Sequence, residues 1–96
     1  MRKYKAAPKV KRNDPRNADQ FIREWIQHVG SILAAEREAK LYRGHLHAWL
    51  SDPGRRFNPD SQRKLARVSG LPIEALQFRF EPIGKLDLWE WLKDFK

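Results

Sequence analysis

The sequence predicts an all-α protein: a compact five-helix helix-turn-helix domain with an additional C-terminal helix and a flexible basic N-terminal arm. Three observations support this fold class. Apolar residues recur at helical spacing in several short segments. Capping residues and helix-ending glycines separate those segments. A chain of 96 residues without cysteine suits one small domain that needs no disulfide and contains no thiolate metal site.

Three regions are expected along the chain. Residues 1–13 contain few large apolar side chains and no regular period, so we expect a flexible basic arm. Residues 14–77 contain five helical segments and should form the domain, and residues 78–96 should form a C-terminal extension with an amphipathic helix.

Positive charge is concentrated in two blocks. The chain has a formal net charge of +8. Residues 1–16 contain seven Lys or Arg and one Asp, and residues 37–67 contain eight Lys or Arg and three acidic residues. Clustered cations indicate a polyanion as partner, although a solvated surface with a charged tail remains the alternative.

The first helix is expected to begin between Asp14 and Asn17. Either Asp14 is the N-cap with Pro15 at the first helical position, or Asn17 is the N-cap with Gln20 three residues later. Gly30 ends the helix. One apolar stripe follows at helical spacing: Ile22, Trp25, Ile26 and Val29.

Two short helices follow. Ser31 is the expected N-cap of a helix over about residues 32–39. A third helix is expected over about residues 43–50, with Leu46 and Trp49 on its inner side. The Pro-Gly pair that follows is typical of a turn that ends it.

The fourth helix has the clearest boundaries. Asn58 is its expected N-cap, Pro59 occupies the first helical position and Gly70 ends it. Pro72 then begins a fifth short helix, over residues 72–77.

The C-terminal extension is expected to contain a short extended segment at 78–80 and a sixth helix over 85–96. One face of that helix is apolar: Leu88, Trp91, Leu92 and Phe95. We expect this face to join two chains in a homodimer, because an exposed face of this kind favours association. The alternative is that the helix completes the core.

The spacing over residues 31–50 is typical of a helix-turn-helix. The two helices can pack at a steep angle only if five apolar positions close on one another: Ala35, Ala39, Leu41, Leu46 and Trp49. The outer face of the second helix then carries Arg43, His45 and His47. Tyr42 should lie at its entrance.

Other classes of function find little support. His45 and His47 are two positions apart, which on a helix is about 200°, so they should not share a metal ion. Nothing groups a nucleophile with a base or forms a phosphate-cradling glycine loop, so neither an enzyme nor a cofactor is expected. No apolar run is long enough to cross a membrane, and no apolar stretch follows the basic N-terminus as in a secretory signal. We therefore expect a cytoplasmic protein.

The segment LYRGHLHAWLSDPGRRFNPDSQRKLARVSGLPIEAL resembles the lambda-repressor-like (Cro/repressor type) helix-turn-helix family. The resemblance covers about Phe21 to Phe78. It implies a five-helix bundle that binds double-stranded DNA, often as a dimer, and usually regulates transcription as a small repressor or regulator. Family members usually place Ala and Gly where this chain has Glu36 and Lys40. We therefore expect Glu36 to reach solvent past the packed partner helix, and Lys40 to adopt a left-handed conformation or a turn of different shape.

The resemblance also implies roles for individual residues. Base contacts are expected from the start and front of the recognition helix: Tyr42, Arg43, Gly44 and His47. Phosphate contacts are expected from the turn and the following loop: Lys40, Ser51, Arg55, Arg56 and Asn58. The arm should lie along the DNA through its cations: Arg2, Lys3, Lys5, Lys9, Lys11 and Arg12. The alternative function is a protein- or RNA-interaction adaptor that uses the basic face and the Trp-rich C-terminal helix.

Overall fold

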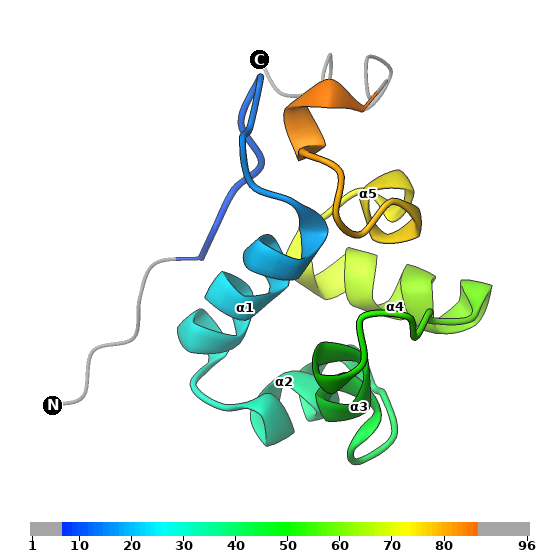
Figure 1. Ribbon diagram of the computed structural model, residues 1–96. Coiled ribbons are helices and arrows are strands. Elements are labelled where there is room, and N and C mark those ends of the chain that lie inside the picture. The colour runs from blue at the N-terminus through cyan, green and yellow to red at the C-terminus, as the bar shows by residue number, and fades with distance from the viewer. Residues whose placement is uncertain (1–6, 87–96) are drawn as a thin grey trace, which may run out of the picture.

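Figure 1 shows the computed structural model, which describes residues 7–86. This part of the chain forms five α-helices and a short 3₁₀ helix, with no strand, so the expected all-α class is confirmed. The elements are α1 (Ala18–Val29), α2 (Ile32–Ala39), α3 (His45–Ser51), α4 (Pro59–Ser69), α5 (Ile73–Gln77) and the 3₁₀ helix η1 (Ile83–Lys85). No described helix is long and apolar enough to cross a membrane.

The expected sixth helix, including its apolar face, falls almost wholly outside the described residues. Those apolar positions are Leu88, Trp91, Leu92 and Phe95.

Helices α2 and α4 occupy the centre of the domain. α2 packs against α1, α3 and α4, and α4 also packs against α5 (Figure 1). Each helix contributes side chains to one core, and the largest fully buried apolar ones are Trp25, Trp49, Phe21, Ile22, Leu46, Leu65, Leu71 and Ile83. The apolar stripes of the sequence thus face one another, with α3 held at the edge of the bundle by its inner side alone.

Local capping explains where α1 begins. Asn17 accepts a hydrogen bond from the backbone N–H of Gln20 at 2.8 Å, and the Gln20 side chain accepts one from the Asn17 N–H at 3.0 Å. This capping box satisfies two N–H groups that the helix start leaves unpaired. Asp14, the alternative cap, is instead buried and accepts hydrogen bonds from the Arg16 side chain.

The other predicted caps are confirmed. The Ser31 hydroxyl accepts from the third N–H of α2, and the Asn58 side chain does the same for α4, which has Pro59 at its first turn. Gly70 follows α4 in a left-handed conformation with φ of 78°. These short-range signals fix α2 and α4 where the sequence predicts them.

The segment expected to be a flexible arm is packed in its described part. Val10 is 7% exposed and belongs to the core. The Lys9 carbonyl accepts a hydrogen bond from Arg16, and the Lys11 N–H donates to Asp14. Val10 is one apolar residue among cations and therefore shows no helical or strand periodicity. Its place in the core could not be predicted from the sequence pattern. The packed unit therefore begins before residue 14.

Residues 13–16 and η1 lie side by side. The N–H of Ile83 donates to the Arg16 carbonyl at 2.8 Å, and the N–H of Gly84 donates to the Asp14 carbonyl at 2.8 Å. A Cβ on Gly84 would collide with the backbone of Asn13 and Asp14. Glycine at this position therefore permits the close approach of the two segments.

Residues 78–80 form a turn, not the expected extended segment. The N–H of Glu81 donates to the Phe78 carbonyl at 3.0 Å, and the Arg79 side chain is 8% exposed. The alternation of Phe and Arg imitates a strand. The segment turns because Arg79 points inward to partners distant in sequence, while Phe78 and Phe80 stay exposed.

Candidate nucleic-acid interface

The start of α3 is held by Glu36 of α2. The Glu36 residue is 2% exposed. Its carboxylate accepts hydrogen bonds from the backbone N–H groups of Gly44 at 3.0 Å, Leu46 at 2.8 Å and His47 at 3.4 Å. α3 has no side-chain cap of its own, so Glu36 supplies the acceptors that a helix start lacks.

The expectation that Glu36 reaches solvent is therefore wrong. Three N–H donors at the start of α3 satisfy the carboxylate inside the domain, where a carboxylate without partners would be costly. The larger side chain that replaces the family's usual small residue is accommodated by pointing along the interface toward the next helix.

The connection between α2 and α3 contains two left-handed residues. Lys40 has φ of 59° and ψ of 38°, which is the left-handed conformation that its position predicts. Gly44 has φ of 85°, and a Cβ on it would touch nothing within 4 Å. Glycine is favoured there by its backbone conformation. Because Gly44 is not helical, α3 begins at His45 and not at the expected residue 43.

Three of the four predicted base-contacting residues gather at the start of α3. Tyr42, Arg43 and Gly44 line one hollow of about 300 Å³ with Arg55 from the following loop. Tyr42 is 82% exposed. His47 is also exposed but does not line this hollow.

The predicted phosphate-contacting residues are divided among four places. Arg55 and Arg56 lie in the loop between α3 and α4, and Ser51 ends α3. Lys40 lines a separate hollow between α2 and α4 with Lys64 and Arg67. The remaining one, Asn58, uses its side-chain oxygen to cap α4.

The cations of this face are largely uncompensated. Among the residues that the structure describes, Lys40, Arg43, Arg55 and Arg56 take part in no ion pair. All four are exposed. Their field can therefore act on a ligand outside the protein.

The described cations of the predicted arm do not join this face. Lys9, Lys11 and Arg12 are exposed on the segment beside η1, which lies at the end of the molecule opposite α3 in Figure 1. Three further arm cations lie outside the described residues: Arg2, Lys3 and Lys5.

Behind the α3 face, aromatic rings form a continuous row. The Tyr42 and His45 rings stack with centroids 6.3 Å apart, and His45 meets the edge of Phe57 at 5.1 Å. Phe57 stacks on Trp49 at 5.1 Å. The Arg79 guanidinium lies 3.8 Å from the Trp49 ring centroid and completes the row. The exposed Tyr42 is thus connected by packing to the core.

Arg79 links α1, α3 and the turn after α5. Its guanidinium donates to the Asp19 carboxylate at 2.7 Å and 3.2 Å and to the Asp52 carbonyl at 2.9 Å. Its own carbonyl accepts from the N–H groups of Ala18 and Asp19 at the start of α1. Burial alone would raise the pKa of Asp19, but the hydrogen bonds from Arg79 and Arg23 outweigh it and lower that pKa. No sequence pattern predicts this role, because Arg79 and Asp19 are 60 residues apart.

His45 makes stability depend on pH. Burial and the nearby Arg55 charge lower the pKa of His45 below its ordinary 6.5, although Glu36 opposes the shift. The unfolded chain therefore binds this proton more readily than the folded chain. The stabilisation is present above about pH 6.5 and is lost as pH falls through the lowered pKa.

We expect the free energy of unfolding to fall as the pH is lowered from about 6.5 through the lowered pKa of His45. His45→Gln should remove part of this slope, whereas His47→Gln, at an exposed position of the same helix, should keep it. Urea unfolding at several pH values measures the slope. Equal slopes in wild type and His45→Gln would contradict the assignment.

Within the described residues, no group of three or more His, Cys, Asp or Glu is placed to hold a metal ion. No family model, curated protein or solved structure matches the chain.

Proposed function

We propose that this protein binds double-stranded DNA sequence-specifically, with α3 in the major groove, and acts as a small transcriptional repressor or regulator. The observation that carries the proposal is the α2–α3 connection. A left-handed residue, Lys40, joins two short helices that pack together through Ala39, Leu46 and Trp49. This arrangement supports a helix-turn-helix, a motif that would present the outer face of its second helix to the major groove.

The chemistry of that face suits DNA. An α-helix fits the width of the major groove, and a guanidinium can donate two hydrogen bonds to guanine O6 and N7. Arg43 is exposed and has no ion-pair partner among the described residues. It stands beside Tyr42 at the start of α3 and is therefore the best candidate for a base contact.

Side chains, and not the backbone N–H groups at the start of α3, would bind the phosphates of the DNA. A helix start can attract an anion through its unpaired N–H groups. Here the Glu36 carboxylate already occupies those of Gly44 and Leu46. Arg55 and Arg56, exposed in the next loop, are then the groups that can neutralise the DNA backbone.

Arg43→Ala should relax sequence preference. We expect a loss of about 1–3 kcal/mol of discrimination at one base pair, because one bidentate contact disappears. Selection of bound sequences from a random duplex pool, followed by titration of the selected site and its single-base variants, measures this loss. A two-fold symmetric selected site would also support a homodimer.

Lys85→Ala is the charge-matched control. It removes one exposed cation from η1, at the opposite end of the molecule from α3 (Figure 1). Its base preferences should match those of the wild type. Unchanged specificity and affinity in Arg43→Ala would show that α3 is not the recognition helix.

A protein- or RNA-interaction adaptor is the second candidate. Phe78 and Phe80 are 52% and 55% exposed, an unusual pair of apolar side chains on one turn. Under this alternative, Phe78→Ser together with Phe80→Ser would abolish partner binding. Partner binding that survives this double substitution would contradict the adaptor.

A further inference from the structure

The indole N–H of Trp49 is a hydrogen-bond donor that no group of the described residues accepts. The residue is 1% exposed, and its ring is packed by Phe57 and Arg79. Its indole N–H donates to no atom of the described residues. A buried tryptophan N–H normally finds a partner, because an unpaired buried donor costs free energy.

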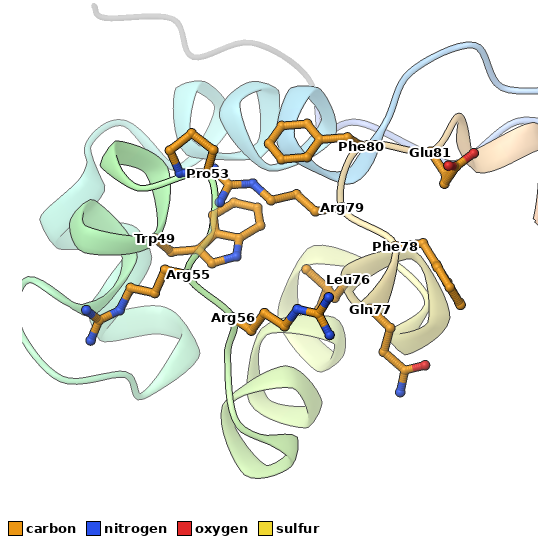
Figure 2. A pocket seen from close by; sticks show the side chains of 10 residues that line it. All are labelled: Trp49, Pro53, Arg55, Arg56, Leu76, Gln77, Phe78, Arg79, Phe80 and Glu81. Atoms are coloured by element: carbon orange, nitrogen blue, oxygen red, sulfur yellow. The ribbon is translucent and has the colours of Figure 1, made fainter.

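The indole N–H opens into a hollow. Among polar side-chain atoms of the described residues, only Nδ1 of His45 is sealed from solvent without a partner, so the Trp49 nitrogen is not sealed. The hollow has a volume of about 240 Å³ and lies between the α3–α4 loop and the end of α5. Figure 2 shows the indole nitrogen on the ring edge nearest Arg56 and Leu76 in that view.

The groups around this opening are mainly donors. Arg55 and Arg56 line the hollow, are exposed and form no ion pair within residues 7–86. Gln77 adds an amide, and the Arg56 guanidinium extends toward it (Figure 2). Indole and guanidinium groups donate and cannot accept, so the complementary ligand is an anion with several acceptor oxygens. Glu81 is the one carboxylate on the rim.

The hollow adjoins the face proposed to bind DNA. Arg55 lines both this hollow and the one formed by Tyr42, Arg43 and Gly44 at the start of α3. A duplex that receives α3 in its major groove would therefore carry its flanking backbone past Arg55 toward Arg56. The oxygens of a phosphodiester fit the donor set there.

We propose that the Trp49 indole N–H, Arg56 and the Gln77 amide form a phosphate site that holds one phosphodiester group of the bound duplex. This inference rests on the proposed function and assigns Trp49 a ligand-binding role in addition to its place in the core. The site gives the protein a fixed contact beside α3, which would set how deeply that helix enters the groove.

The test follows the Trp49 indole resonance by NMR in the full ¹⁵N-labelled chain. Trp49→Phe keeps an aromatic ring but removes the indole N–H. The indole resonance that is missing from the spectrum of this variant is therefore that of Trp49. Sodium phosphate is titrated against sodium chloride at equal ionic strength, and a mixed-sequence duplex is titrated separately. We expect the Trp49 indole proton to move downfield with duplex, while the Trp25 indole, in the core at 2% exposure, moves little.

Arg56→Ala is a second variant for the case that Trp49→Phe folds poorly. Because Arg56 is exposed, its replacement should not disturb folding. It should remove the Trp49 shift and weaken duplex binding about tenfold for all sequences alike. Lys85→Ala should do neither.

The outcomes separate the site from the proposed function. Duplex binding without a Trp49 shift overturns the phosphate site but leaves DNA binding intact. A Trp49 shift with phosphate in the absence of duplex binding supports the site and overturns the proposed function. No shift with either titrant overturns the site.

Discussion

Glu36→Ala is expected to destabilise the protein by about 3 kcal/mol. The substitution removes the acceptor of three N–H groups at the start of α3 and leaves those of Gly44 and Leu46 without partners. It also leaves a space beside α3, because the side chain is buried. Denaturant unfolding measures the loss, and the melting temperature should fall by more than about 10 °C.

Glu38→Ala is the matched control, since Glu38 is an exposed residue of the same helix. It should change the free energy of unfolding by less than about 0.5 kcal/mol. Glu36→Gln keeps an acceptor oxygen but turns an amide NH₂ toward the N–H donors, so its loss should be intermediate. A Glu36→Ala protein as stable as Glu38→Ala would contradict the capping role.

Arg79→Ala should have an effect of similar size, about 3 kcal/mol, because it breaks a largely buried ion pair. Asp19 would lose its partner at 2.7 Å and keep only Arg23, which bonds it at 2.9 Å from an exposed position. Trp49 would lose the guanidinium over its ring, and the Asp52 carbonyl would lose a donor. Denaturant unfolding measures this loss also.

A double-mutant cycle with Asp19→Asn isolates the pair itself. The two substitutions together should cost clearly less than the sum of each alone, because either one removes the same interaction. Arg67→Ala, at an exposed position of α4 without an ion pair among the described residues, is the control and should be close to neutral. Strict additivity would mean that Arg79 acts through Trp49 and the Asp52 carbonyl and not through Asp19.

The sequence predicts the helices well where their ends carry local signals. Ser31, Asn58 and Gly70 act on groups within four residues of themselves, so their roles are visible in the order of residues. The sequence predicts the start of α3 two residues too early, because Gly44 can be helical or left-handed and only the packing of α2 against α3 decides which.

The candidate site depends more on contacts between distant residues. The expected exposure of Tyr42 and Arg43 agrees with the structure, but helical spacing is not the reason, because both residues precede α3 and lie in the connection after α2. The buried roles of Glu36 and Arg79 could not be predicted from pattern, because charged residues are expected at the surface unless their partners are known. The half-buried position of His45 could not be predicted either, because its ring lies against Phe57 of the α3–α4 loop.

Glu36 and Arg79 together hold the seven-residue helix α3, and under the proposed function they would make it a rigid recognition element. Glu36 holds the beginning of α3, and Arg79 holds its end through Trp49 and the Asp52 carbonyl. The exposed Arg43 then projects from a fixed support, which is what discrimination between bases requires. The stability predictions for Glu36 and Arg79 therefore also concern the proposed function, because both residues support the exposed Arg43.

The most direct test of that function is the salt dependence of binding to a mixed-sequence duplex, measured by fluorescence anisotropy. Each phosphate neutralised should contribute about −0.9 to the slope of log K against log salt concentration. Two or more contacts from Arg55, Arg56 and their neighbours predict a slope steeper than about −1.8. Arg56→Ala should reduce its magnitude by about 0.9, whereas Lys85→Ala should leave it unchanged. Absence of duplex binding at low salt, or binding that does not respond to salt, would contradict DNA as the partner.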